Sequence, residues 1–218
     1  MCGRAVIISP IEVIAEEFNI DNPRMTLKPN YNISPSQNLL VIIKQQSRQL
    51  MTCQWGFIPS WAKDPAIGHK MINARAETIA SKPAFRSAYK KQRCLIVADG
   101  FYEWQKTEKG KTPYYIHLRS GKPFGLAGIY NRWTQDNGED MLTCSIITTN
   151  ANELIEPVHD RMPVIIPKDS MDVWLGDDTN PSSMLKPYPS DEMELYQITT
   201  KVNDPKHNSP DLLEPVLK

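Results

Sequence analysis

The residue with the most distinctive chemistry is Cys2, which lies between Met1 and Gly3. Methionine aminopeptidase removes a methionine that precedes a small residue, so we expect Cys2 to become the first residue of the mature protein. Its α-amine, with a reference pKa of about 7.7–8.0, would then be partly neutral at pH 7 and would stand beside the thiol. Such a pair converts an aldehyde first to an imine and then to a thiazolidine ring. Cysteine also occurs at this position by chance, so the rest of the chain has to decide.

The segment from Ile72 to Glu77 alternates apolar and polar residues. As an extended strand it would present Asn73, Arg75 and Glu77 on one face, because successive side chains of a strand point to opposite sides. This donor-rich row could bind an anionic ligand. An ordinary solvated strand face has the same pattern, and both interpretations stay open.

Two residues could supply proton transfers. Glu103 lies in an aromatic segment and shares a strand face with Phe101 and Gln105. A carboxyl group in apolar surroundings has a raised pKa, which suits a general acid or base. His159 lies in a proline-bounded loop, and histidine titrates near neutral pH. The alternatives are an exposed strand glutamate and an unspecialised surface loop.

Two other residues could contact nucleic acid. Arg161, in the same loop as His159, could bind a phosphate. Trp61 ends an aromatic, proline-held turn over residues 55–61 and could stack on a base if it is exposed. Aromatic residues in such turns more often belong to the core.

Short strands dominate the elements that must position these residues. Ser9 as the N-cap, Pro10 and Glu12 predict a helix that reaches Phe18. Further helices are predicted over 82–91 and 168–175, with one helical turn over 150–155. Strands are predicted over 39–43, 49–57, 94–98, 100–106, 113–118, 124–133, 141–149 and 164–166. Those after residue 94 would form an antiparallel meander, with turns at 108–111, at 120–121 and at Asn137-Gly138, and residues 203–215 an ordered surface wrap.

Composition narrows the class of protein. The 218 residues predict one domain (1–218) of the α+β class, with a curled, mostly antiparallel, barrel-like sheet core and peripheral helices. Lys+Arg and Asp+Glu are both 25, so a nucleic-acid site would be a local patch. The four cysteines and four histidines are scattered, which predicts no disulfide framework, metal or cofactor, with Cys53, Cys94 and Cys144 as core residues. Without a membrane span or a signal segment, we expect a cytoplasmic protein.

Six ordered motifs together resemble the signature of a known family. They are M-C-G-R at 1–4, Y-N-I-S-P at 31–35, W-G-F-I-P-S-W at 55–61, I-N-A-R-A-E at 72–77, A-D-G-F-Y-E-W at 98–104 and V-H-D-R-M-P at 158–163. In this order they resemble the SOS-response-associated peptidase (SRAP) family, which includes proteins that protect abasic sites in single-stranded DNA. The resemblance covers nearly the whole chain.

The resemblance implies a suicide DNA–protein cross-linker that acts on abasic sites in single-stranded DNA. Cys2 would attack the ring-opened aldehyde of the abasic deoxyribose and end as a thiazolidine. Asn73 would hold the N-terminus and the sugar, Glu103 would act as acid and base, and His159 would assist ring closure. The residues implied to contact DNA are Arg4, Asn32, Pro35, Trp61, Arg75, Thr148 and Arg161, with the three arginines on phosphates. No metal or membrane is implied, and we expect a monomer.

The chain departs from some family members in two ways. Ala62 stands where some relatives carry a second aromatic residue after the one that matches Trp61, which would weaken a strand-separating wedge. The neutral net charge disfavours tight non-specific DNA binding. Two other functions remain open: a cysteine peptidase built from Cys2, His159 and Glu103, and a non-catalytic reader of modified DNA bases.

Overall fold

The protein is described by a computed structural model, which covers residues 2–216 apart from 22, 109, 136 and 177–180. Five strands close into a barrel, in the cyclic order β4 (Arg48–Trp55), β3 (Asn38–Lys44), β6 (Arg93–Ala98), β9 (Phe124–Thr134) and β10 (Asp140–Asn150). Three short strands extend it: β5 (Asn73–Arg75) and β11 (Arg161–Pro163) pair with β10, and β12 (Ile165–Ile166) pairs with β9. Most of these pairings are antiparallel, whereas β10 runs parallel to β4 and β5.

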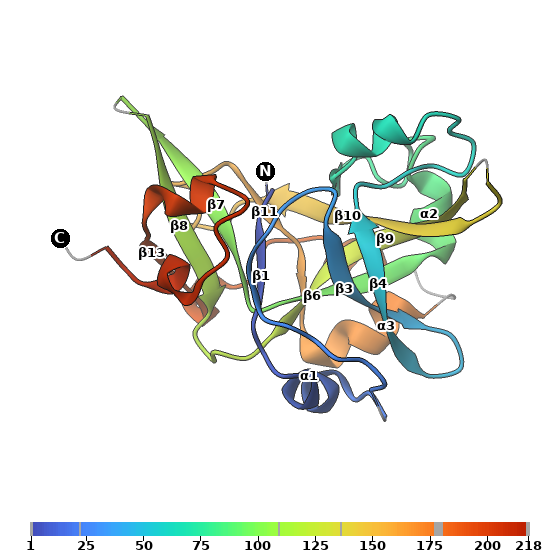
Figure 1. Cartoon of the computed structure of the whole chain (residues 1–218), viewed down its shortest axis with the longest axis horizontal. Helices are drawn as coiled ribbons and strands as arrows, with labels where there is room; N and C mark the ends of the chain where they lie inside the picture. The colour runs from blue at the N-terminus through green and yellow to red at the C-terminus, as the bar shows by residue number, and fades with distance from the viewer. Residues whose placement is uncertain (1, 22, 109, 136, 177–180, 217–218) are drawn as a thin grey trace.

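A second, open sheet lies beside the barrel. It has the order β13 (Met193–Gln197), β8 (Gly110–Leu118), β7 (Gly100–Thr107), β1 (Ala5–Ile7) and β2 (Asn30–Ile33), and all its pairings are antiparallel. In Figure 1, β7, β8 and β13 lie on one side of β1 and the barrel strands on the other. This arrangement confirms the α+β class with a curled, mostly antiparallel, barrel-like core.

The helices are short and peripheral. They are α1 (Ile11–Phe18), α2 (Arg86–Lys91) and α3 (Met171–Leu175), with 3-10 turns at η1 (Pro65–Lys70), η2 (Lys168–Ser170), η3 (Pro181–Met184), η4 (Ser190–Glu192), η5 (Thr200–Asn203) and η6 (Pro210–Leu213). Helix α2 is shorter than the predicted 82–91, because residues before Phe85 form separate turns. The predicted helix over 168–175 is confirmed as η2 followed by α3.

The main core fills the barrel. Along β3 the run from Leu39 to Ile43 is buried throughout, as expected for a strand covered on both faces. The cysteines Cys53, Cys94 and Cys144 are buried and unpaired within this core, which confirms their assignment as small core residues. The barrel therefore supports β5, which pairs with the barrel strand β10.

The predicted meander is wrong, because the chain changes sheets at Asp99. Strand β6 ends at Ala98 in the barrel and β7 begins at Gly100 in the second sheet. Strands β7 and β8 form one hairpin, while β9 returns to the barrel and pairs with β6 and β10. Where the chain passes from the barrel to the second sheet, a Cβ on Gly100 would overlap the ring of Tyr115, so only glycine fits at this position. The turn expected at Asn137-Gly138 is confirmed, because it joins the antiparallel strands β9 and β10 and Gly138 has a φ of +83°. The turn expected at 108–111 includes Lys109, which lies outside the described residues.

The carboxylate of Asp99 fixes the end of β1. It accepts hydrogen bonds from the main-chain nitrogens of Ile8 and Ser9, at 2.6 and 2.9 Å, and from the Ser9 hydroxyl. The expected N-cap role of Ser9 is therefore wrong: its hydroxyl is committed to Asp99, and α1 is preceded by Pro10 without a side-chain cap. Asp99 thus holds the short strand that carries the N-terminal residues.

The predicted surface wrap at the C-terminal end is confirmed. The side-chain amide of Asn32 donates to the carbonyl oxygens of Val202, Asp204 and His207, at 3.3, 3.0 and 2.9 Å. The Arg4 guanidinium donates to the same Val202 oxygen at 2.6 Å. The segment from η5 to η6 is therefore fastened to β2 and to the residues that precede β1.

Candidate active site

Cys2 is fully buried where the two sheets meet. The Nδ2 of Asn73, in β5, donates a hydrogen bond of 2.8 Å to the Cys2 carbonyl oxygen. The thiol donates a long bond of 3.9 Å to the carbonyl oxygen of Arg4. Burial raises the pKa of this thiol, and the negative charge of Glu103, in β7, raises it further. The barrel and the second sheet each contribute one polar residue to the surroundings of Cys2.

The second atom of the Asn73 amide is also informative. Its Oδ1 is buried and has no hydrogen-bond partner among the described residues. A buried acceptor without a donor costs about 1–3 kcal/mol, so such atoms commonly mark a ligand or functional position. Asn73 can therefore hold the Cys2 carbonyl with one end of its amide while the other end accepts a further donor.

Glu103 provides a carboxyl group with a strongly altered acidity. It is 2% exposed, opposite Tyr114 of β8 and one residue from Trp104. Burial raises its pKa from the ordinary value of 4.5 to about 7. At neutral pH the group is thus divided between acid and base forms, as the aromatic sequence around it indicated.

The His159 ring is held by its own loop. Its Nδ1 lies 3.0 Å from the main-chain nitrogen of Arg161 and 2.9 Å from an oxygen of Asp160. These contacts require different states, because Nδ1 accepts from Arg161 only when unprotonated and donates to Asp160 only when protonated. Burial lowers the pKa of the ring, and the positive charge of Lys106 contributes to the lowering. We therefore assign the neutral ring, with its proton on Nε2 and its Nδ1 accepting from Arg161.

A pocket of about 450 Å³ joins Glu103 and His159 to the surface. Its lining comprises Gly3, Arg4, Glu103, Trp104, Lys106, Lys111, His159 and Asn203. Gly3 brings the N-terminal segment into the wall directly beside Cys2. The charged lining is cationic apart from Glu103, which favours an anionic ligand.

Arg161, which the sequence suggested as a phosphate ligand, is committed elsewhere. Its guanidinium donates two hydrogen bonds to Glu77, at 2.6 and 3.0 Å, and others to Asn150 Oδ1 at 2.9 Å and to Thr148 O at 2.7 Å. The Arg161 contact is the main reason that the pKa of Glu77 is lowered. Thr148 is itself fully buried. These contacts argue against direct DNA binding by the Arg161 and Thr148 side chains and assign both to the framework behind His159.

Arg4 and Asn32 are similarly engaged. Arg4 donates to Asn32 Oδ1 at 2.6 Å, and its guanidinium carbon lies 5.9 Å from the centre of the Trp104 ring. Asn32 is 1% exposed, and its amide is fully used within the chain, so its expected contact with DNA would require rearrangement. Pro35, three residues after Asn32, is half-buried. Arg4 lines the pocket, but both of its terminal guanidinium nitrogens already donate to oxygens of the chain.

Two of the suggested DNA contacts are open to solvent. Trp61 is 62% exposed, although its neighbours Ile58 and Ala62 are buried in a small cluster with Trp133. Arg75 is exposed at the end of β5, two residues from Asn73. Both side chains are available to an external partner.

Sequence reasoning missed several residues of the site. Glu77 and Arg161 were each noted separately, but only the structure joins them in a bidentate ion pair. The pocket also includes Lys106, Lys111 and Asn203, which lie outside the recognised motifs. Lys106 shortly precedes the expected turn at 108–111 and Lys111 ends it, but these positions did not show which face of the hairpin meets the N-terminal segment.

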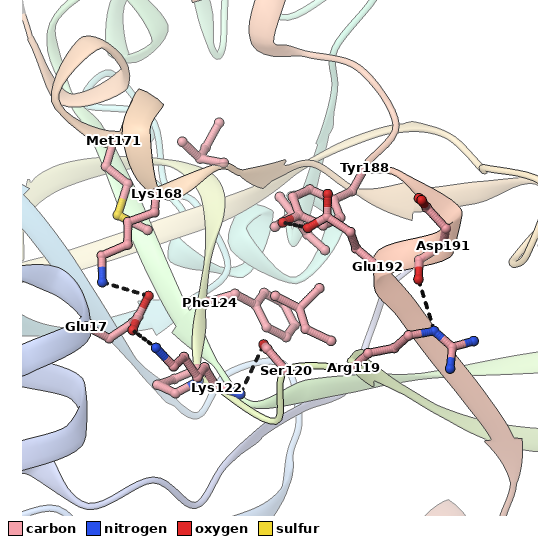
Figure 2. A pocket seen from close by; sticks show the side chains of 14 residues that line it. Glu17, Arg119, Ser120, Lys122, Phe124, Lys168, Met171, Tyr188, Asp191 and Glu192 are labelled. Carbon is pink, nitrogen blue, oxygen red and sulfur yellow. Dashed lines mark hydrogen bonds and ion pairs between the residues drawn. The ribbon is translucent and has the colours of Figure 1, made fainter.

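Another pocket, of about 470 Å³, lies away from Cys2 between α1, α3 and the β8–β9 connection (Figure 2). Its polar side chains bond largely to one another: Glu17 contacts both Lys122 and Lys168, and the Tyr188 hydroxyl lies 2.9 Å from Glu192. Although this pocket is slightly larger than the one beside Glu103, these polar side chains are already paired with one another. Among the described residues, no cluster of three metal-binding side chains occurs, and no helix is long and apolar enough to span a membrane.

Comparison with known proteins decides the family. The profile of the SOS response associated peptidase (SRAP) family matches residues 1–205. The chain belongs to the SRAP family. It is 48% identical to the Bacillus subtilis abasic site processing protein YoqW, over 98% of this chain and 99% of that protein. It is 28% identical to abasic site processing protein HMCES of Xenopus tropicalis, over 87% and 67% of the two chains.

A solved structure shares the SRAP fold of this chain. The crystal structure of a Bacteroides thetaiotaomicron protein superposes with a TM-score of 0.87 at 29% identity, covering 99% of this chain and all of that one. The barrel and the adjacent sheet thus recur in an experimentally determined relative.

Proposed function

We propose that this SRAP protein processes abasic sites in single-stranded DNA by capturing the sugar covalently with Cys2. Its relatives YoqW and HMCES are named abasic site processing proteins, which supports the class of substrate. The observation that carries the mechanism is the setting of Cys2, bonded through its carbonyl to Asn73 and placed close enough to Glu103 for that carboxylate to affect its thiol pKa. Catalysis requires cleavage of the peptide bond before Cys2.

The first step joins the α-amine of Cys2 to C1′ of the ring-opened sugar. The amine nitrogen forms a bond to the aldehyde carbon, and the carbonyl oxygen becomes a hydroxyl group. Glu103 in its acid form then protonates that hydroxyl, which leaves as water and produces the protonated imine, whose nitrogen keeps one proton of the original amine. A carboxyl with a pKa of about 7 is suited to this work, because it still holds a proton at neutral pH.

The second step closes the ring. The thiol sulfur bonds to the carbon of the protonated imine, whose nitrogen becomes a neutral secondary amine. The thiol proton passes to the Glu103 carboxylate and restores its acid form. The overall reaction releases one water, so no oxidant or reductant is needed. Since burial raises the pKa of the thiol, the amine attacks first. Neutral His159, with its proton on Nε2, relays protons at the pocket mouth.

Asn73 positions both partners in this scheme. Its Nδ2 holds the Cys2 carbonyl, and its unpartnered Oδ1 accepts a hydrogen bond from the α-amine or from the hydroxyl of the addition intermediate. The exposed Arg75 and Trp61 then bind the strand on the barrel side, through a phosphate and a base.

A general cysteine peptidase fits the site less well. Such an enzyme needs a thiolate that is accessible to a polypeptide, whereas burial and Glu103 both favour the neutral thiol at Cys2. Self-directed removal of the residue before Cys2 is compatible with this setting, because it requires one turnover. If the protein were a non-catalytic reader of modified DNA bases, the unpartnered Oδ1 of Asn73 and the raised pKa of Glu103 would have no explanation.

The test compares three proteins with an abasic single-stranded oligonucleotide. The wild type should form an adduct that survives heat and denaturant. Cys2→Ala retains the α-amine and Cys2→Ser retains it with a hydroxyl, so both should yield only an imine that borohydride must trap. A stable adduct in Cys2→Ala without borohydride would overturn the proposal. Mass spectrometry of the wild-type adduct should show the sum of the two masses less one water.

A further inference from the structure

We propose that Lys106 and Lys111 form a phosphate-binding subsite, which takes a phosphodiester of the strand on the side of the lesion opposite to Arg75. This inference rests on the proposed function for the identity of the ligand. Its physical basis is the pairing of the two lysines across a hairpin and their place in the wall of the Glu103 pocket.

The two lysines are direct cross-strand partners. The register of β7 and β8 places Lys106 opposite Lys111, so both side chains rise from the same face of the hairpin. Like charges in this position repel and destabilise a sheet. Among the described residues neither lysine forms an ion pair, and both are exposed. The pair is therefore a concentrated positive charge without an internal counter-ion, which an external anion would neutralise.

The position of this pair links it to the chemistry. Strand β1 pairs with β7 only at Phe101 and Gly100, so β7 continues past the N-terminal segment as part of a projecting hairpin (Figure 1). Lys106 and Lys111 line the same pocket as Glu103 and His159. Lys106 is also close enough to His159 for its charge to help lower the pKa of that ring.

The arginines near the site cannot replace this pair. The two terminal nitrogens of each guanidinium, in Arg4 and in Arg161, already donate to oxygens of the chain. Arg75 is exposed but belongs to β5, on the barrel side of Cys2. A strand whose sugar enters the pocket has a phosphate on each side of the lesion. Arg75 is suited to one of them, and the lysine pair of the second sheet is suited to the other.

The experiment measures binding without covalent capture. Every protein carries Cys2→Ala, and the probe is a fluorescein-labelled single strand that contains a tetrahydrofuran abasic analogue, which has no aldehyde. Anisotropy gives the binding constant at several salt concentrations. Adding Lys106→Gln and Lys111→Gln together should reduce the slope of log K against log salt by about 0.7, which corresponds to the loss of one phosphate contact on a single strand.

Two matched variants give the result its meaning. Lys122→Gln also removes one positive charge, but Lys122 follows the other end of β8, which ends at Leu118, about 24 Å along the strand from Lys111. This variant should leave the slope unchanged. Lys106→Arg with Lys111→Arg keeps both charges and should preserve the slope. An unchanged slope in the double glutamine variant, or an equal loss in Lys122→Gln, would overturn the subsite.

Failure of the proposed function would look different. If wild-type protein forms no adduct with a true abasic oligonucleotide while the slope still falls in the double glutamine variant, the capture chemistry is wrong and the phosphate subsite stands. If the adduct forms and the slope is unchanged in the double glutamine variant, the capture chemistry stands and the phosphate subsite is wrong. Circular dichroism and the melting temperature verify that the double variant is folded, and removal of the repulsion should leave its melting temperature no lower than that of its parent.

Discussion

The side-chain amide of Asn73 bonds to the carbonyl oxygen of Cys2 at 2.8 Å, and this contact joins the barrel to the N-terminal segment. The carbonyl belongs to the same residue as the proposed nucleophiles, so the bond fixes the orientation of that residue relative to β5. Asn73 is in turn fixed by the pairing of β5 with β10, where it lies opposite Ile146. The position of the reactive residue thus depends on the stability of the barrel.

Asn73→Asp should slow adduct formation by about 10–100-fold, since it removes a buried donor worth about 1–3 kcal/mol and adds a negative charge. The measurement is the single-turnover rate with an abasic oligonucleotide. The control is Asn137→Asp in the exposed β9–β10 turn, which should leave the rate unchanged. A rate in Asn73→Asp equal to that of the wild type would show that the bond does not orient Cys2.

Glu103→Gln should stabilise the fold increasingly as pH rises. The Glu103 carboxyl has a pKa of about 7 in the folded protein and an ordinary value of 4.5, so between these values folding requires it to stay protonated and the wild type loses stability with rising pH. Glutamine avoids this loss. Urea unfolding should show the advantage of the variant growing by about 3 kcal/mol from below pH 4.5 to above pH 7. A constant difference across this range would contradict the burial of an ionisable Glu103.

The rate of adduct formation should pass through a maximum near neutral pH. It rises as the α-amine loses its proton, at about pH 7.7–8.0 for an unperturbed group, and falls as Glu103 loses the proton it must donate. Glu103→Gln should be slower and should lack the descending limb. Persistence of that limb in the variant would assign it to another group.

His159→Gln should affect ring closure more than imine formation. Burial lowers the pKa of His159, so the neutral ring is available to carry protons during the second step. We expect about a 10²-fold slower approach to the stable adduct, the lower range for a lost proton-transfer group. Borohydride trapping should meanwhile capture a larger share of the complex as imine. Equal slowing of both readouts would instead place His159 in the first step.

Arg161 and Arg75 should separate into structural and binding roles. Arg161→Ala leaves the buried carbonyl oxygen of Thr148 without this donor and should lower the free energy of unfolding by about 1–3 kcal/mol, without altering the salt dependence of binding by the folded protein. Arg75→Gln should have little effect on stability and reduce the salt slope by about 0.7. Salt titrations and urea unfolding of the two variants provide the comparison. A smaller salt slope in Arg161→Ala would restore its expected contact with phosphate.

Local patterns in the sequence predicted most of the strands and the fold class. The apolar run at Leu39–Ile43 and the alternation in Phe101–Gln105 each correspond to a strand. Strand pairing was not predictable, because alternation shows which residues share a face and not which strand lies alongside. Only Asp99 separates β6 from β7, so no local pattern indicated that these two strands belong to different sheets.

Some properties of the site residues could be predicted from local sequence, and others depend on distant partners. The chemistry of Cys2 and the acidity of Glu103 follow from residue type and immediate neighbours. Whether an arginine is free or engaged depends on distant partners, such as Glu77 for Arg161 and Val202 for Arg4. Sequence patterns contain no information on those distances. Three arginines were therefore expected to bind phosphates, whereas in the structure Arg4 and Arg161 are bonded within the chain.

The attachment of the C-terminal end to Arg4 has a practical consequence. The family match ends at residue 205, which invites trimming of the chain there for biophysical work. That cut would remove His207, whose carbonyl receives the Asn32 amide, and Asp211, which holds Lys201 at 2.8 Å. The shortened protein would retain every motif of the family and yet lose two contacts that hold in place Asn32 and the η5 segment, to which Arg4 is bonded.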